Sequence, residues 1–407
     1  MNDIVEILRL AHGGDGVAAD GTFVPFTVPG DAVRVERGGK RARLVEIVSQ
    51  GAWRATPPCS YFGRCGGCAL QHVVRAPYLA WKREQVVAAL AQRGFANVAV
   101  EETRAVPPGT RRRAVFKARR TADKTQLGFF ERESRTLVDI TECPLLVPEL
   151  AKLIGPLREM LGRLLQPGEA TEIHATATQT GIDLSLKLKR RQPPDALSEL
   201  AQWAGKRKLA RFVLDGELIA VFAEPRLTFG RIAVDLPAEA FLQPTTEGEH
   251  MLQELVREGV GSAKRVCDLF AGCGTFALFL ASGRRIHAVD FGGRMIEALD
   301  DAARAGGAGA QVTTEWRDLF RRPLTAHELK PYDAVVIDPP RVGAKAQAEQ
   351  LAAALVPRIV YVSCNPASFA RDARVLADGG YKLARVVPVD QFLWSPHIEL
   401  VGFFERG

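Results

Sequence analysis

The sequence predicts an α/β protein built from a small amino-terminal β-barrel, an α+β central region and a carboxyl-terminal, doubly wound Rossmann-like sheet. Three observations predict this fold class. Residues 1–50 are short apolar runs broken by turn signals such as Asp20-Gly21 and Pro29-Gly30, a pattern typical of small barrels or sandwiches. Strand-like alternation returns between residues 110 and 236. After residue 238, apolar strands alternate with helical segments, which is typical of a parallel sheet covered by helices.

The composition is that of a folded globular protein. The chain has 407 residues, of which 47% are hydrophobic and 25% charged, so disordered and fibrous classes are excluded. Its apolar stretches are interrupted by charge, Pro or Gly, and we expect a cytoplasmic protein with no membrane partner. The net charge of +7 favours an anionic partner. Seven cysteines, an odd number, favour metal binding or catalysis over a disulfide framework.

We place the domain boundaries at residues 1–50, 51–236 and 237–407. The proline-marked stretch GAWRATPP separates the first two domains. A helix is expected over about 77–93, because apolar residues recur there at helical spacing, at Leu79, Val86, Val87 and Leu90. In the central domain, apolar residues alternate with polar ones as in a half-buried strand, at Ile182, Leu184, Leu186 and Leu188.

Four cysteines form a set with the spacing of metal ligands. Cys59, Cys65 and Cys68 are spaced C-x5-C-x2-C, and Cys143 follows 75 positions later. Structural zinc sites usually take two close pairs of ligands, whereas this spacing is closer to the C-x4-C-x2-C…C pattern of iron–sulfur proteins. We therefore expect these four thiols to hold a [4Fe-4S] cluster, with zinc as the alternative.

A glycine-rich turn in VCDLFAGCGTFA predicts a nucleotide-type cofactor. A strand ends at Asp268 and Leu269, Gly272 and Gly274 lead into a helix, and the next strand ends in Asp290. A carboxylate at that place can reach ribose hydroxyls, so an adenosyl cofactor is indicated. The same turn fits the dinucleotide pattern G-x-G-x-x-A, and a turn without a ligand is the other interpretation.

Two further strands end in residues that can carry chemistry. Asp338 follows the strand in YDAVVIDPPR, and Cys364 follows the strand in IVYVSCNP. Taken singly, Asp338 fits a turn and Cys364 fits a buried strand. Ligands of open α/β sheets bind at the carboxyl ends of the strands. If the two strands are neighbours, both side chains therefore lie beside the glycine turn.

The thiol favours methyl transfer to a ring carbon over transfer to an amine. Amino methylation is disfavoured because Arg341, and not an aromatic residue, follows Asp-Pro-Pro. A thiolate at Cys364 can add to C6 of a pyrimidine and make C5 nucleophilic. A base must then remove the C5 proton. His397 and Glu399 in SPHIELVGFF are the candidates, since a carboxylate inside an apolar strand is costly unless it is paired or used.

The stretches CSYFGRCGGC, FLQ, DLFAGCGTF, IDPPR, VSCNP and PHIEL, in this order, resemble the RNA (uracil-5)-methyltransferase family, in particular its iron–sulfur 23S rRNA members. The resemblance covers nearly the whole chain. It implies an S-adenosylmethionine-dependent methyltransferase domain at the carboxyl end, a [4Fe-4S] cluster in the central domain and an RNA-binding, TRAM-like barrel at the amino end. It also implies that the helix over 77–93 packs on the catalytic domain.

The resemblance assigns roles to individual residues. Cys364 corresponds to the nucleophile, Glu399 to the base and Phe241 to an aromatic residue near the target base. The positions that match cofactor-contacting residues of the family are Gln243, Phe270, Thr275, Asp290, Asp318 and Asp338. Two of them depart from the family pattern: Asp290 replaces the usual Glu, and Thr275 stands where Asn is common.

The expected function is S-adenosylmethionine-dependent conversion of one uridine to 5-methyluridine in RNA, by a monomer. The expected substrate is 23S rRNA, and transfer RNA is the alternative. A basic strand face is expected to contact phosphates, through Arg111, Arg113, Lys117 and Arg119. Two hypotheses from other classes compete: an iron–sulfur oxidoreductase using a nicotinamide cofactor, and an RNA-binding module with an inactive catalytic domain.

Overall fold

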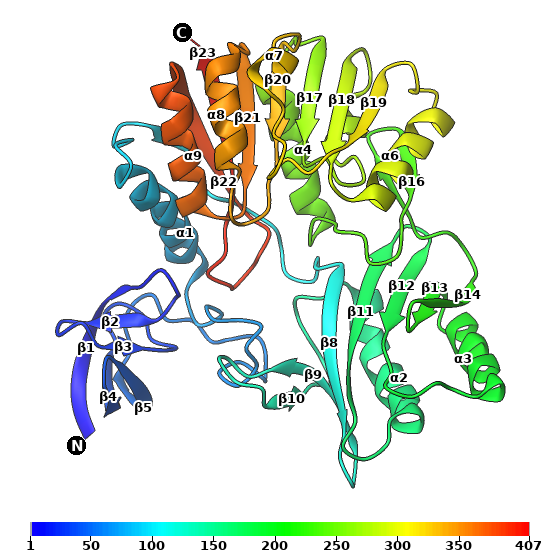
Figure 1. Ribbon diagram of the computed structural model, residues 1–407. Helices are drawn as coiled ribbons and strands as arrows, with labels where there is room; N and C mark the ends of the chain where they lie inside the picture. The colour runs from blue at the N-terminus through cyan, green and yellow to red at the C-terminus, as the bar shows by residue number, and fades with distance from the viewer. Residues whose placement is uncertain (1, 407) are drawn as a thin grey trace.

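The computed structural model describes residues 2–406 and shows three parts. In Figure 1 the carboxyl-terminal sheet lies above, a small barrel lies at the lower left, and the central sheet lies at the lower right. Among residues 2–406, no helix combines the length and the apolar character that crossing a membrane requires.

The first part is a closed five-stranded barrel with the order β1-β2-β3-β5-β4, which closes because β1 pairs with both β2 and β4. Its interior is filled by small aliphatic residues such as Val24, Val33 and Val35. The strands are β1 (Asn2–Leu10), β2 (Gly16–Ala18), β3 (Phe23–Val24), β4 (Ala32–Gly38) and β5 (Arg41–Ser49).

The central part is a seven-stranded sheet with the order β10-β9-β8-β11-β12-β13-β14. Helices α2 (Pro148–Leu164) and α3 (Pro194–Lys206) contribute Leu157 and Leu200 to its core. The strands are β8 (Arg113–Arg120), β9 (Thr125–Phe130), β10 (Leu137–Asp139), β11 (Ala170–Thr178), β12 (Gly181–Leu186), β13 (Leu209–Leu214) and β14 (Glu217–Val221).

The side chains of β8 alternate as its sequence predicts, with Ala114, Phe116 and Ala118 buried. On the opposite face, two of the basic side chains expected to contact phosphates make contacts within the protein. Arg113 donates to the Leu242 carbonyl, and Lys117 pairs with Glu172. Part of the predicted phosphate-binding stripe is therefore used inside the protein.

The third part is a large, mostly parallel sheet with the order β19-β18-β17-β20-β21-β23-β22-β6, and β7 also pairs with β22. Strand β23 runs antiparallel to both of its neighbours, β21 and β22, and β22 runs parallel to β6 and β7. The strands are β17 (Arg265–Leu269), β18 (Arg285–Asp290), β19 (Val312–Trp316), β20 (Ala334–Ile337), β21 (Arg358–Ser363), β22 (Tyr381–Asp390) and β23 (Glu399–Arg406).

Helices cover both faces of this sheet, as expected for a doubly wound fold. Leu252 of α4 and Leu299 of α6 lie in one core cluster, while Leu351 of α8 and Leu376 of α9 lie in the other. The helices are α4 (Thr246–Val260), α5 (Ala277–Leu280), α6 (Gly293–Ala305), α7 (Ala326–Leu329), α8 (Lys345–Ala354) and α9 (Pro366–Asp378).

Two segments outside residues 237–407 join this carboxyl-terminal part. Helix α1 (Arg75–Ala91) packs Val86 and Leu90 into the cluster that holds α8 and α9, and β6 (Ala99–Val100) and β7 (Arg104–Ala105) extend the sheet along β22. The hairpin of β15 (Arg226–Phe229) and β16 (Ile232–Asp235) packs in the α4 and α6 cluster.

Candidate active site

The glycine turn after β17 adopts a backbone that few residues tolerate. Phe270, Gly272 and Gly274 all have positive φ, at 64°, 54° and 93°. At Gly274 an added Cβ would approach the Leu278 side chain to 2.8 Å, so glycine is needed there both for the dihedral and for the space. The turn brings its backbone to the carboxyl end of the sheet, where ligands of such folds bind.

Asp290 is tied to this turn. Its two carboxylate oxygens accept from the backbone N–H groups of Gly272, at 3.0 Å, and Gly292, at 2.7 Å. Each oxygen keeps a lone pair that a ribose hydroxyl can use. The shorter side chain is thus oriented at the cofactor turn by two backbone amides.

The other predicted cofactor residues of the turn region lie around it. Thr275 is half-buried, and its carbonyl accepts from Gln253 at 3.0 Å. The ring of Phe270 lies 5.5 Å from that of Phe320. Asp318 lies farther out, after β19, and its carboxylate accepts from the backbone N–H of Phe320 at 3.0 Å. It therefore shapes its own loop.

Cys364 and Glu399 lie side by side because of strand register. Ser363, the last residue of β21, pairs with Leu400 of β23. The next residues along, Cys364 and Glu399, are therefore brought together at the end of the two strands. Glu399 is only 3% exposed, whereas Cys364 is half-buried and His397 is exposed. Of the two candidate bases, Glu399 is the one that lies inside the site.

Asn365 explains why the strand ends on Ser-Cys-Asn-Pro. Its side chain caps helix α9 by accepting from the Ala367 N–H at 3.1 Å, and Pro366 occupies the first helical turn, where no N–H is needed. The Asn365 amide also donates to the carbonyl of Arg341 at 3.0 Å, and Ser368 donates to the same carbonyl. The thiol is thus fixed between a strand end and a helix start, beside the Asp-Pro-Pro-Arg loop.

A chain of polar side chains connects the predicted cofactor site to the predicted base. The Gln243 amide donates to Asp338 at 3.4 Å, and its carbonyl accepts from Gln391 at 2.7 Å. Gln391 also donates to Glu399 at 3.0 Å. The fold therefore brings Gln243, Asp338, Cys364 and Glu399 together from four separate stretches of sequence.

Burial and like charges raise the pKa values of these acids. Burial, and then Glu399 and Asp338, raise the pKa of the Cys364 thiol to about 11, against the opposing effect of Arg341. Burial and the Asp290 charge raise the pKa of Asp338 to about 7. The pKa of Glu399 is raised well above its usual range by burial and by Asp338, while the hydrogen bond from Gln391 opposes that shift. Clustered shifts of this kind are typical of catalytic sites.

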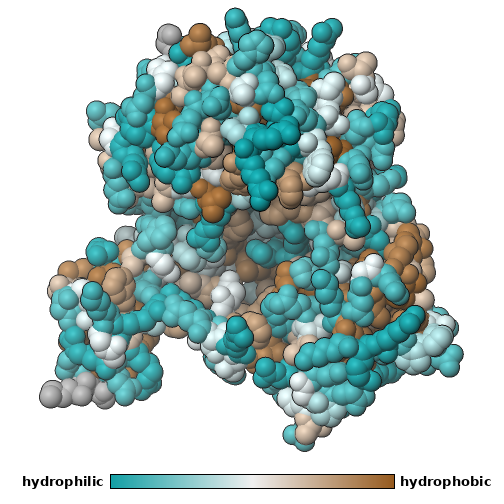
Figure 2. Space-filling model, viewed as in Figure 1, coloured by the Kyte–Doolittle hydropathy of each residue, from teal (hydrophilic) through white to brown (hydrophobic). Residues whose placement is uncertain are grey.

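The site opens between the carboxyl-terminal and central parts of the molecule. Figure 2 shows a hollow between the two, with apolar surface inside it. Phe241 is 64% exposed, and the Arg113 guanidinium of the central sheet lies 5.2 Å from the centre of its ring. An exposed aromatic ring close to Gln243 is available to stack on a base.

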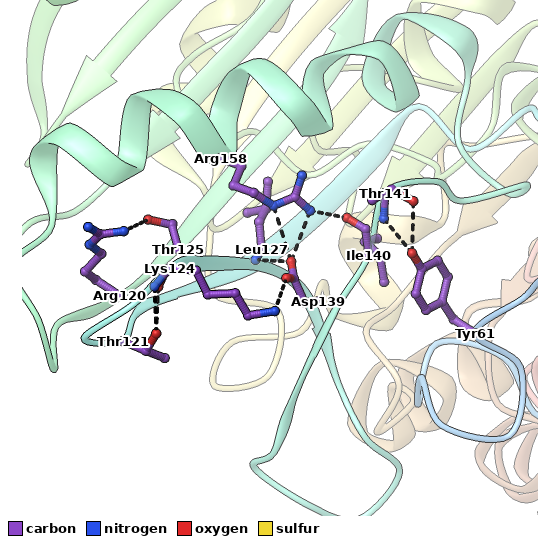
Figure 3. A network of polar contacts seen from close by, with 10 residues as sticks. All are labelled: Tyr61, Arg120, Thr121, Lys124, Thr125, Leu127, Asp139, Ile140, Thr141 and Arg158. Carbon is purple, nitrogen blue, oxygen red and sulfur yellow. Dashed lines mark hydrogen bonds and ion pairs between the residues drawn. The ribbon is translucent and has the colours of Figure 1, made fainter.

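The four predicted cluster cysteines gather at one place, and all are free and half-buried. Residues next to the cysteines are in contact: the Tyr61 hydroxyl accepts from the Thr141 N–H at 3.0 Å and contacts the Thr141 hydroxyl at 2.9 Å (Figure 3). Ser60 also donates to Glu142 at 2.9 Å. These contacts hold the loop of the first three cysteines against the segment that carries Cys143.

The same thiols influence one another electrostatically. Burial, followed by the proximity of Cys143, Cys65 and Cys59, raises the pKa of Cys68 to about 12. Burial raises the pKa of the Cys143 thiol, and the backbone N–H groups of Leu145 and Leu146 oppose that shift. Within residues 2–406, no group of three or more His, Cys, Asp or Glu side chains is arranged to hold a metal ion.

Sequence reasoning missed Gln391 and the residues that fix it. Gln391 follows β22 directly and is 1% exposed. The available signal was the stretch VVPVDQF, in which two polar residues end an apolar strand. Periodicity alone does not show that such residues lie beside a thiol on another strand.

Comparisons with known proteins show which proteins the chain resembles. A family model described as tRNA (Uracil-5-)-methyltransferase matches residues 309–406. A Brucella suis protein described as an uncharacterized RNA methyltransferase is 44% identical over 407 residues, covering 99% of this chain and 98% of the relative. The 23S rRNA (uracil(1939)-C(5))-methyltransferase RlmD of Chromohalobacter salexigens is 35% identical, covering 99% of this chain and 89% of the relative.

The fold is also shared with a solved structure. The Pyrococcus abyssi tRNA (uracil-54, C5)-methyltransferase, in complex with S-adenosyl-L-homocysteine, superposes with a TM-score of 0.78 at 24% identity, covering 99% of this chain and 100% of the other. The carboxyl-terminal part therefore has the fold of S-adenosylmethionine-dependent methyltransferases. On the strength of its full-length relatives, the chain belongs to the RNA (uracil-5)-methyltransferase family.

Proposed function

We propose that this protein methylates C5 of a uridine in RNA, with Cys364 as the nucleophile and Glu399 as the base. The observation that carries the proposal is the juxtaposition of Cys364 and Glu399 at the ends of β21 and β23, beside Asp338. A lone thiol or carboxylate has many structural roles, but a buried base next to a half-buried thiol at a ligand-binding sheet edge suits covalent catalysis.

The reaction begins at C6 of the uracil ring. The Cys364 thiol gives up its proton to solvent and its Sγ forms a bond to C6, while the C5=C6 electron pair moves toward C5 and O4, which makes C5 nucleophilic. S-adenosylmethionine, when bound, would supply the methyl group that C5 takes, the bond from that methyl to the cofactor sulfur would break, and S-adenosylhomocysteine would leave. Glu399 then takes the proton from C5, the C5=C6 bond re-forms, and the bond from C6 to Cys364 breaks to release the thiolate.

The proposed cofactor residues lie at three places around the site. Asp290 and the Gly272 turn suit the ribose, and Phe270 offers an aromatic face at the same place. Gln243 and Asp338 lie between this turn and the Cys364 and Glu399 pair, where the reacting methyl group belongs. Thr275 and Asp318 are proposed as contacts at the edge of the same site.

The decisive experiment uses RNA that contains 5-fluorouridine. Because fluorine at C5 leaves no proton for Glu399, incubation with S-adenosylmethionine should give a protein–RNA adduct that survives denaturing electrophoresis. Cys364→Ala should form no adduct and transfer no tritium from labelled cofactor. Methylation of C5 by the Cys364→Ala variant would refute the mechanism.

We further propose that Cys59, Cys65, Cys68 and Cys143 hold a [4Fe-4S] cluster. A single zinc ion needs its sulfur ligands about 2.3 Å from one point, whereas a four-iron cluster binds each thiolate at a different iron and spreads them further apart. Four free thiols, brought together from two segments of the chain and close enough to influence one another's pKa values, support this choice. Anaerobically purified protein should contain iron and sulfide, and Cys143→Ser should lose both.

We propose that the substrate is 23S rRNA and that the protein acts on it as a monomer in the cytoplasm. The support is the 35% identity to RlmD across nearly the whole chain, which exceeds the 24% identity to the transfer-RNA enzyme. The closed barrel, domain 1–50, is proposed as a TRAM-like RNA-binding unit, beside a central domain 51–236 and a catalytic domain 237–407 that α1 and β6 complete. Mass spectrometry of 23S rRNA and transfer RNA from a deletion strain tests the assignment, because only the true substrate loses 5-methyluridine.

A further inference from the structure

Gln391 is a buried amide that lies between two residues of the active site. It follows the last residue of β22, and its Nε2 donates to the Gln243 Oε1 at 2.7 Å and to the Glu399 Oε2 at 3.0 Å. Both amide hydrogens are therefore used on acceptors. Its own carbonyl oxygen, Oε1, is buried and has no hydrogen-bond partner among the described residues.

This orientation of the amide is set by its neighbours. The reverse orientation would place the Gln391 carbonyl against the oxygens of Gln243 and Glu399 and leave both without a donor. Space for the unpaired Oε1 is kept by Gly248 of α4, where an added Cβ would lie 2.6 Å from it. A buried carbonyl without a donor is unfavourable, so the site holds this arrangement at a cost in stability.

The backbone that carries Gln391 is fixed from the other side of the sheet. The preceding residue, Asp390, accepts from the Tyr78 hydroxyl at 2.6 Å and from Lys82 at 2.9 Å, both on α1. Val389 pairs with Glu399 across β22 and β23. The amide and the carboxylate are thus held on adjacent strands with little freedom to separate.

We propose that Gln391 is a positioning residue that favours the ionised form of Glu399 and aims it at C5, which rests on Glu399 being the base of the proposed function. The groups that face Glu399 are Asp338 directly after β20, Cys364 directly after β21 and Gln391 directly after β22. Burial and the charge of Asp338 disfavour the negative charge of Glu399. Gln391 supplies the hydrogen bond that favours it.

The test substitutes Gln391→Met, which has a similar length but no donor. Proton removal from C5 is then expected to slow about tenfold near neutral pH, the loss expected for one hydrogen bond to a charged group. The rate should recover at higher pH, because without the Gln391 hydrogen bond the pKa of Glu399 is raised further. With natural RNA, the covalent adduct should accumulate, since Cys364 still attacks but release is slow. Tritium release from [5-³H]uridine RNA, measured across pH, gives the profile, and denaturing gels give the adduct.

The matched control is Gln347→Met. Gln347 lies on α8 and is equally buried. Both of its side-chain hydrogen bonds are to the backbone of Leu324, away from the site. It should lower the melting temperature without altering the pH profile or trapping an adduct. Gln391→Glu, which places a second carboxylate beside Glu399, should shift the profile further than Gln391→Met.

The outcomes separate the two claims. An unchanged pH profile and no adduct accumulation in Gln391→Met would overturn the role of Gln391 alone. If Glu399→Gln released tritium at the wild-type rate, or Cys364→Ala formed the adduct, the proposed function itself would fall.

Discussion

The thiol of Cys364 lies among groups that oppose its ionisation. Burial, Glu399 and Asp338 all raise its pKa, and the positive charge of Arg341 is the opposing influence. In the free protein the thiol is therefore protonated at neutral pH, and it becomes a strong nucleophile only as that proton leaves. We therefore expect slow alkylation of this thiol at neutral pH when no RNA is bound.

Alkylation of Cys364 by iodoacetamide tests this at the residue scale. Since the pKa of the thiol is about 11, the thiolate fraction rises about tenfold for each pH unit below that value. The rate, followed by mass spectrometry of the Cys364 peptide, should climb from pH 7 to 10 without a plateau. A plateau near pH 8 would contradict the prediction.

Arg341→Met extends the same test. Removing the cation that favours the thiolate should move the alkylation profile to still higher pH, while Arg341→Lys should stay near the wild type. Arg341 is exposed, so neither variant is expected to unfold. Identical profiles for all three proteins would show that Arg341 does not act on the thiol.

At the scale of elements, α1 and the loop after β22 form one unit. Lys82 and Asp390 are a fully buried ion pair, Lys82 also donates to the His397 carbonyl, and the Tyr78 hydroxyl accepts from the Trp394 N–H at 2.9 Å. The N–H groups of Ala69 and Leu70, beside Cys68, donate to the Trp394 carbonyl. The cysteine loop and α1 thus support the segment that leads to Glu399.

Lys82→Met should be strongly destabilising, by about 3–5 kcal/mol, because it leaves the Asp390 carboxylate buried without its cation. Adding Asp390→Asn to that variant should recover part of the loss. Urea unfolding of the three proteins measures both effects. The matched surface change is Lys345→Met, whose exposed pair with Glu349 at 3.8 Å should contribute less than about 1 kcal/mol. Equal losses for the two lysine variants would refute the argument.

At the scale of the whole molecule, the central and carboxyl-terminal parts are joined by a second buried ion pair. Arg112, directly before β8, pairs with Glu249 of α4 and donates to the backbone carbonyl of Gln243 at 3.0 Å. The side chains of Arg112 and Glu249 are only 4% and 3% exposed. The Arg112–Glu249 ion pair, called the joint below, therefore fixes the backbone of Gln243, whose side chain hydrogen-bonds to Asp338 and Gln391.

Arg112→Met should therefore affect both stability and cofactor binding. Leaving Glu249 buried without a partner should cost about 3–5 kcal/mol, and Arg112→Met/Glu249→Gln should cost less. Calorimetric titration at a temperature where both variants are folded should show weaker S-adenosylmethionine binding, because Gln243 loses its backbone anchor. Arg226→Met is the control, since its pair with Asp235 is exposed. Unchanged cofactor affinity in the single variant would contradict the proposed role of the joint.

Much of the fold followed from local pattern. Alternation predicted β8 and β12, the turn signals predicted the barrel region, and the glycine turn predicted a tight link after β17. Local pattern could not predict which distant segments join the edge of the large sheet. Residues 99–105 pair with β22 almost three hundred positions later, and pairing at such separation depends on tertiary packing and not on a local period.

The sequence by itself determined which residue types stand at the ends of β20, β21 and β23, because strand period and strand boundaries are local properties of the chain. Tertiary structure alone decided that Cys364 meets Glu399, since that depends on the register between β21 and β23. It also decided that Gln391 bridges Gln243 and Glu399 and that α1 supports the loop. The physical reason is that hydrogen bonds and desolvation act between neighbours in space, whatever their distance along the chain.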